Sequence, residues 1–102
     1  MEKAETRRHL RVYWAVRATI TTNSGKKIEI ETVDVGLGGM RFIAKVPLEI
    51  DEQVFGELPL PDGADHKIEG TVVERKGKNP YKLHVAFTDT TMQELAKRNL
   101  EI

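Results

Sequence analysis

The sequence has no cysteine among its 102 residues, which excludes disulfide bonds, thiolate metal sites and a cysteine nucleophile. Aromatic residues amount to only 6%, so few side chains are available for base stacking. No apolar run approaches the roughly 20 residues that a membrane-spanning helix needs. Residues 1–11 are charged from the start and contain no apolar signal segment. Together these absences predict a soluble, cytoplasmic protein without membrane insertion.

The sequence also has no net charge, because 16 basic residues balance 16 acidic ones. The distribution is uneven: residues 1–27 contain seven basic and two acidic residues (+5), and residues 28–69 contain three and ten (−7). The remaining residues contain six and four (+2), so the three sums cancel. An acidic middle third repels phosphate, which argues against DNA or RNA as a partner over the whole surface. A local anion site near the N-terminus is compatible with the pattern.

Chain length and composition predict one globular domain over residues 9–102, preceded by a mobile basic tail at residues 1–8. Within the domain, apolar and polar residues alternate in short segments separated by turn sequences, as expected for strands. The expected strands are residues 10–22, 28–34, 40–44, 54–60, 67–75 and 81–87. Thr88–Thr91 offers N-cap residues for a closing helix within residues 90–100. The pattern indicates a mainly β antiparallel barrel or sandwich with a C-terminal helix.

Strict alternation also predicts which side chains share a face. It places Asp34 on the same face as Ile30 and Thr32, and Glu74 on the same face as Ile68 and Val72.

Two groups of residues could bind a ligand. The first is Arg7, Arg8 and Arg11, because arginine binds phosphate bidentately and stacks on purine rings. Two arginines four residues apart, where the tail meets the first strand, can hold an anion from two directions. The alternative interpretation is a solubilising basic tail.

The second group is Asp34 with Gly36, Gly38 and Gly39. A carboxylate can accept hydrogen bonds from the Watson–Crick edge of guanine, and glycines allow a ligand to approach the backbone. Three glycines in four positions predict a tight backbone path. The alternative is a glycine-rich hairpin corner in which Asp34 satisfies local amides.

Taken together, Arg7-x-x-x-Arg11 and Asp34-x-Gly36-x-x-Gly39, in a chain of short strands with a final helix, resemble the PilZ domain family. The family's motifs are RxxxR and, about two dozen residues later, [D/N]xSxxG. The resemblance covers nearly the whole chain. It includes GGMRF at 38–42, LPLPDG at 58–63, VVERKG at 72–77 and HVAFTD at 84–89.

The resemblance implies a bacterial, non-enzymatic receptor for cyclic di-GMP, built as a six-stranded antiparallel Greek-key-like β-barrel with a C-terminal helix. It implies that Arg7 and Arg11 contact phosphates and guanine edges, and that Arg8 stacks or pairs beside them. Asp34 would accept from guanine, and Gly39 would allow a close backbone approach. In the family the tail folds over the ligand and changes contacts with a separate effector protein, in control of motility or biofilm formation.

Two positions depart from the family pattern. Gly36 replaces the motif's serine, and losing one hydrogen bond lowers affinity about two- to tenfold. His84 stands where family members often carry glycine, and it either crowds the ligand, adds a donor or is an ordinary surface residue. The alternative function is therefore a PilZ-like adaptor that has lost nucleotide binding and acts through protein contacts.

Other chemistry has weaker support. No metal site is expected, because the histidines are scattered without a carboxylate at ligand spacing: His9, His66 and His84. No enzyme is expected either, because the carboxylates that could pair with Asp34 lie in turns without a nucleophile: Glu49, Asp51 and Glu52. Trp14 and Phe42 are predicted to be core residues rather than a platform for single-stranded nucleic acid.

Overall fold

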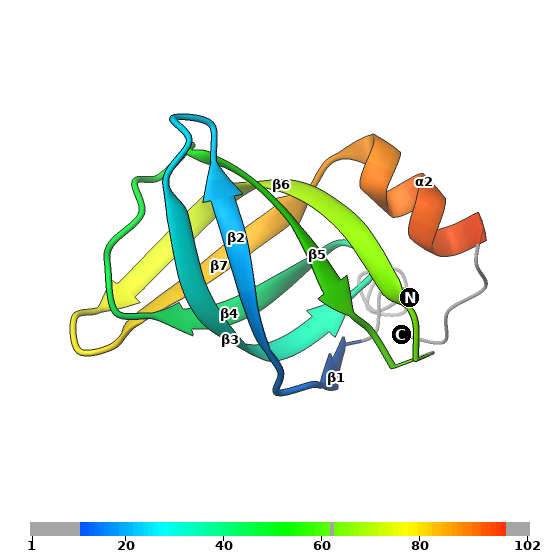
Figure 1. Ribbon diagram of the computed structural model, residues 1–102, viewed down its shortest axis with the longest axis horizontal. Helices are drawn as coiled ribbons and strands as arrows, with labels where there is room; N and C mark the ends of the chain where they lie inside the picture. Colours follow the sequence, from blue (N-terminus) through cyan, green and yellow to red (C-terminus); the bar gives the residue numbers. More distant parts are fainter. Residues whose placement is uncertain (1–10, 62, 98–102) are drawn as a thin grey trace, which may run out of the picture.

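The computed structural model describes residues 11–61 and 63–97. The predicted tail at residues 1–8 and the end of the predicted helix at residues 98–100 lie outside the described residues. Figure 1 shows a twisted barrel with one helix at its side. The elements are β1 (Arg11–Tyr13), β2 (Arg17–Thr22), β3 (Lys27–Gly36), β4 (Gly39–Ala44), β5 (Gln53–Pro59), β6 (Asp65–Gly77), β7 (Tyr81–Phe87) and α2 (Asp89–Lys97).

The strands form one antiparallel sheet in the order β1-β3-β2-β5-β6-β7-β4, which closes because β3 also pairs with β4. The barrel therefore comprises β2 to β7, and the predicted six-stranded antiparallel barrel is confirmed. β4 and β5 follow each other in sequence but are not neighbours. Residues 45–52 connect them in a Greek-key-like crossover (Figure 1).

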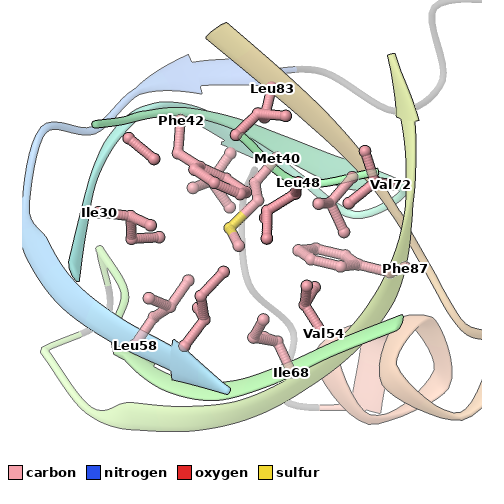
Figure 2. Close-up of a cluster of buried hydrophobic side chains, with 14 of the residues drawn as sticks. Ile30, Met40, Phe42, Leu48, Val54, Leu58, Ile68, Val72, Leu83 and Phe87 are labelled. Atoms are coloured by element: carbon pink, nitrogen blue, oxygen red, sulfur yellow. The ribbon is translucent and has the colours of Figure 1, made fainter. Parts of the chain in front are cut away.

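The interior of the barrel is filled by side chains from β2 to β7. Figure 2 labels ten of these core residues, which come from β3 to β7 and from the crossover. Alternation explains the arrangement: Met40, Phe42 and Ala44 are buried, while Arg41 between them is exposed. Leu48 from the crossover, 2% exposed, also enters this core. Phe42 is 1% exposed and Trp14 packs partly buried against the core, so their predicted core role is confirmed.

The helix α2 begins at Asp89, slightly earlier than the prediction of residue 90. Thr88 is its N-cap, because its hydroxyl oxygen accepts a hydrogen bond from the Thr91 amide (3.2 Å). The Thr91 hydroxyl in turn accepts from the Glu69 amide (2.9 Å), which ties the helix to β6. Leu95, 1% exposed, joins the core cluster. In the described part of the chain, no helix is both long and apolar enough to cross a membrane.

The prediction of one continuous strand over residues 10–22 is wrong, because residues 14–16 interrupt it between β1 and β2. Both strands nevertheless pair along the same edge of β3. Thr32 holds the interruption together: its hydroxyl donates to the Trp14 carbonyl and accepts from the Val16 amide (2.9 Å). Thr32 is 1% exposed, so these bonds are shielded from water.

Two β-bulges break the strict alternation, one between Thr32 and Asp34 and one between Val72 and Glu74. A bulge inserts one extra residue, so every later side chain changes face. The prediction that Asp34 shares a face with Thr32, and Glu74 with Val72, is therefore wrong. Both residues lie on the outer surface of the barrel, where Asp34 meets Arg41 and Glu74 meets His84.

Candidate ligand-binding site

Five residues on five neighbouring strands lie opposite one another on the outer surface of the barrel. Tyr13 pairs in register with Asp34, Asp34 with Arg41, Arg41 with His84, and His84 with Glu74. We call these residues the outer row. Residues directly opposite each other in an antiparallel sheet are close enough to interact, so the register makes this row one continuous chemical surface.

An ion pair between Asp34 and Arg41 forms the centre of the outer row. The Nε atom of Arg41 donates to Asp34 Oδ2 at 3.0 Å and to Oδ1 at 3.2 Å, and Nη2 donates to Oδ2. Asp34 is 3% exposed, whereas the Arg41 side chain is 51% exposed. The pair therefore joins a buried carboxylate to a guanidinium that reaches solvent.

This contact fixes the charge as well as the orientation of the arginine. The hydrogen bond to Asp34 raises the pKa of Arg41 above its ordinary value, and partial burial opposes that shift. Because the ordinary value already lies far above neutral pH, Arg41 remains charged at every pH at which the protein works. A bidentate carboxylate contact also limits rotation of the guanidinium plane.

The far end of the outer row carries a second set of charges. His84 is half-buried on β7, and its Nδ1 atom lies 3.9 Å from Glu74 Oε1. The other oxygen of Glu74 lies 3.3 Å from Lys76 Nζ. His84 thus adjoins Arg41 on one side and an acid on the other, on the outer surface of the barrel.

The pairing of β1 with β3 brings the two predicted motifs together. Arg11 lies opposite Gly36, and Tyr13 opposite Asp34, although each pair is separated by about two dozen positions in sequence. Arg7 and Arg8 lie outside the described residues. The last residue of the first motif and the first half of the second motif therefore lie on adjacent strands of one sheet.

The glycines of the second motif differ in how much space surrounds them, and so in whether another residue could replace them. A Cβ atom on Gly39 would lie 2.3 Å from the Val85 carbonyl oxygen, so β7 itself requires a glycine there. A Cβ atom on Gly38 would meet nothing within 4 Å. Neither residue has a positive φ, so a left-handed backbone conformation is not what requires glycine at these two positions. Gly36 is buried at the end of β3.

Sequence reasoning missed Arg41 and Tyr13 as members of this surface. Arg41 is one charged residue in an alternating strand, and its partner is defined only by the pairing of β3 with β4. Tyr13 follows the first motif closely and is 88% exposed, which is unusual for a large aromatic side chain. In the sequence, Tyr13 stands two residues after Arg11 and alternates with Val12 and Trp14, which predicts an outward-facing aromatic beside the RxxxR motif. That pattern is the signal that could have identified it.

A shallow hollow lies elsewhere on the described surface and contains no residue of the outer row. It is lined by Gln53, Phe55, Glu69, Gly70, Thr71 and Thr88. Among residues 11–61 and 63–97, no three histidine or acidic side chains gather in a group that could hold a metal ion.

The protein is thus a small antiparallel barrel with a row of charged residues on its outer surface. The chain belongs to the PilZ domain family, whose model matches residues 5–101. No curated protein sequence matches the chain.

Solved structures show the same fold at low sequence identity. The inhibitor of motility MotI/DgrA of Bacillus subtilis is 14% identical, with a TM-score of 0.67 over 91% of this chain and 51% of that one. The PilZ domain of Escherichia coli YcgR, solved with c-di-GMP, is 16% identical, with a TM-score of 0.65 over 89% and 86%. A longer YcgR structure in complex with c-di-GMP is 13% identical, with a TM-score of 0.64 over 89% and 43%. The chain thus spans about half the length of MotI.

Proposed function

We propose that this PilZ domain is a non-enzymatic receptor for cyclic di-GMP, and that the nucleotide binds beside the outer row. Membership of the family and the likeness to a YcgR domain solved with c-di-GMP support this ligand. The proposed contacts are Arg7, Arg8, Arg11, Asp34, Gly36, Gly38, Gly39 and His84. No metal or further cofactor takes part.

The observation that carries the proposal is the register between β1 and β3. It sets Arg11, the last residue of the RxxxR motif, opposite Gly36 on the strand that carries the Asp34 motif. A nucleotide with anionic phosphates and guanine edges needs cationic donors and an acceptor within one ligand's width. The two motifs supply both kinds of group from neighbouring strands.

In this mechanism the arginines contact the phosphates, and Asp34 accepts hydrogen bonds from guanine. A carboxylate has about four lone-pair sites, so Asp34 can keep Arg41 and still accept from a base. Since Asp34 is 3% exposed, neighbouring groups must move before a guanine edge reaches it. Ordering of the N-terminal arginines over the nucleotide would then change the surface offered to an effector protein, such as one that controls motility.

A second function is favoured by two observations at the same place. Gly36 replaces the serine of the family motif, and the Asp34 carboxylate is already engaged by Arg41. Both features weaken a nucleotide site. They fit an adaptor that keeps the barrel and acts through protein contacts alone.

Calorimetric titration with cyclic di-GMP separates the two functions. We expect saturable heat for the wild-type protein, and a loss of affinity of about 10-fold or more for Arg7→Ala and Arg11→Ala, since each removes a charge-assisted hydrogen bond. Arg17→Ala is the matched control, because Arg17 is an exposed arginine on β2 outside the proposed site. Gly36→Ser should bind equally or up to about tenfold more tightly. Absence of heat from the wild-type protein would establish the adaptor instead, and wild-type affinity in both arginine variants would refute the site.

A further inference from the structure

The hydrogen-bond geometry of Arg41 leaves part of its guanidinium unused. Asp34 occupies the edge formed by Nε and Nη2. Among the residues that the structure describes, Nη1 donates to no acceptor. The opposite edge, formed by Nη1 and the second N–H of Nη2, therefore keeps a parallel pair of donors on a side chain that is 51% exposed.

We propose that Arg41 is itself a ligand contact, whose outer edge donates to O6 and N7 of a guanine base while Asp34 holds it in place. The inference rests on the proposed function and deepens it, since it changes the main role of Asp34 from acceptor to anchor. The burial of the two residues supports this division, because the carboxylate is 3% exposed while the guanidinium reaches solvent.

Anchoring gives Arg41 an advantage over an ordinary surface arginine. A long side chain that is immobilised only on binding loses rotamer freedom at that moment, which weakens the complex. Arg41 has already lost much of this freedom through its bidentate contact with Asp34. Its fork is also planar, and a parallel pair of N–H donors matches the two acceptors on the major-groove edge of guanine.

The charges around Arg41 favour a neutral base over a phosphate. Asp34 offsets the charge of Arg41, and Glu74 offsets that of Lys76, so these paired cations attract an anion less strongly than unpaired ones would. Tyr13 adds a second reason, because it lies opposite Asp34 and is 88% exposed. An exposed ring beside an arginine fork suits a planar base that can stack and accept hydrogen bonds together.

The test compares cyclic di-GMP with its 7-deazaguanine analogue, in which CH replaces the N7 acceptor. Affinities for both ligands are measured by calorimetry with the wild-type protein, Arg41→Ala, Arg41→Lys and Arg17→Ala. Arg17 is the matched control because it also lies opposite an acid of β3, Glu31, yet on the regular half of that strand. Arg41→Lys keeps a cation beside Asp34, so it maintains folding if Arg41→Ala does not.

We expect the wild-type protein and Arg17→Ala to bind the analogue about 3- to 10-fold more weakly than cyclic di-GMP, the loss typical of one hydrogen bond. In Arg41→Ala that ratio should fall to about 1, and in Arg41→Lys it should fall below the wild-type ratio, because a point donor replaces the fork. A purely structural role of Arg41 would weaken both ligands equally and leave the ratio unchanged, which overturns the inference. If the wild-type protein binds cyclic di-GMP but shows no preference over the analogue, the inference alone fails. If it binds neither ligand, the proposed function fails with it.

Discussion

The two halves of β3 hold their outward carboxylates in different ways, although they belong to one strand. In the regular half, Glu29 and Glu31 are exposed, and Glu31 forms no ion pair with Arg17, the residue opposite it. In the bulged half, Asp34 is 3% exposed and bound bidentately by Arg41. An arginine thus lies opposite an acid in both halves, but only in the bulged half do the two side chains form an ion pair.

The difference shows what a bulge contributes to a binding domain. The extra residue at Val33 turns Asp34 onto the outer surface, at the place where β1 and β4 pair with β3 from both sides. Exposed ion pairs contribute little to stability, because solvent screens the charges and holding two side chains in one geometry costs conformational entropy. Replacing an acid should therefore lower the free energy of unfolding more in the bulged half of β3 than in the regular half.

The largest expected contrast lies between the turn after β3 and the first residue of β4. Gly39→Ala places a Cβ atom 2.3 Å from the backbone oxygen of Val85, whereas Gly38→Ala meets nothing within 4 Å. We expect Gly39→Ala to lower the free energy of unfolding by about 3 kcal/mol or more, because backbone must move. Gly38→Ala should leave it unchanged or raise it by about 0.4–1 kcal/mol. Urea unfolding of both variants measures this, and equal effects would contradict it.

The second contrast tests the carboxylates directly. Asp34→Ala removes a buried bidentate partner of Arg41 and should lower the free energy of unfolding by about 2 kcal/mol, within the range for hydrogen bonds to charged groups. Glu31→Ala, on the regular half, should change it by less than about 0.5 kcal/mol. Thermal and urea unfolding provide the comparison. If the two substitutions have similar effects, the bulge does not distinguish the two halves.

The smallest contrast concerns the interruption between β1 and β2. Thr32→Val keeps the shape of the side chain but removes the hydroxyl that contacts the Trp14 carbonyl and the Val16 amide. We expect a loss of about 1–2 kcal/mol in the free energy of unfolding, since these buried groups lose a partner. Thr19→Val is the control, because Thr19 is an exposed threonine of β2. A loss of equal size in both variants would assign the effect to β-propensity instead.

Much of the fold was predictable because alternation reports burial residue by residue. Phe42 was predicted to be a core residue, and the structure confirms it; Met40 and Ala44, which alternate with exposed residues on the same strand, are buried beside it. The turn after Thr22 and the capping threonine before α2 also follow from local chemistry, in which a few side chains decide the backbone path. The two motifs were also recognisable, because their residues and spacing can be read directly from the sequence.

The bulges were not predictable, and the errors at Asp34 and Glu74 follow from them. Val33 and Val73 are ordinary strand residues, and nothing in their identity marks them as the extra residue. Arg41 was missed for a related reason: its partner lies across a strand pair and not along the chain.

The sequence by itself determined where most of the strands lie, which of their apolar residues enter the core and where the closing helix is capped. These features depend on side chains within a few positions of each other. Only the tertiary structure decided the bulges, the row from Tyr13 to Glu74 and the ion pair at its centre. Closing six twisted strands into a barrel fixes their relative register, and register is set by all the strands together.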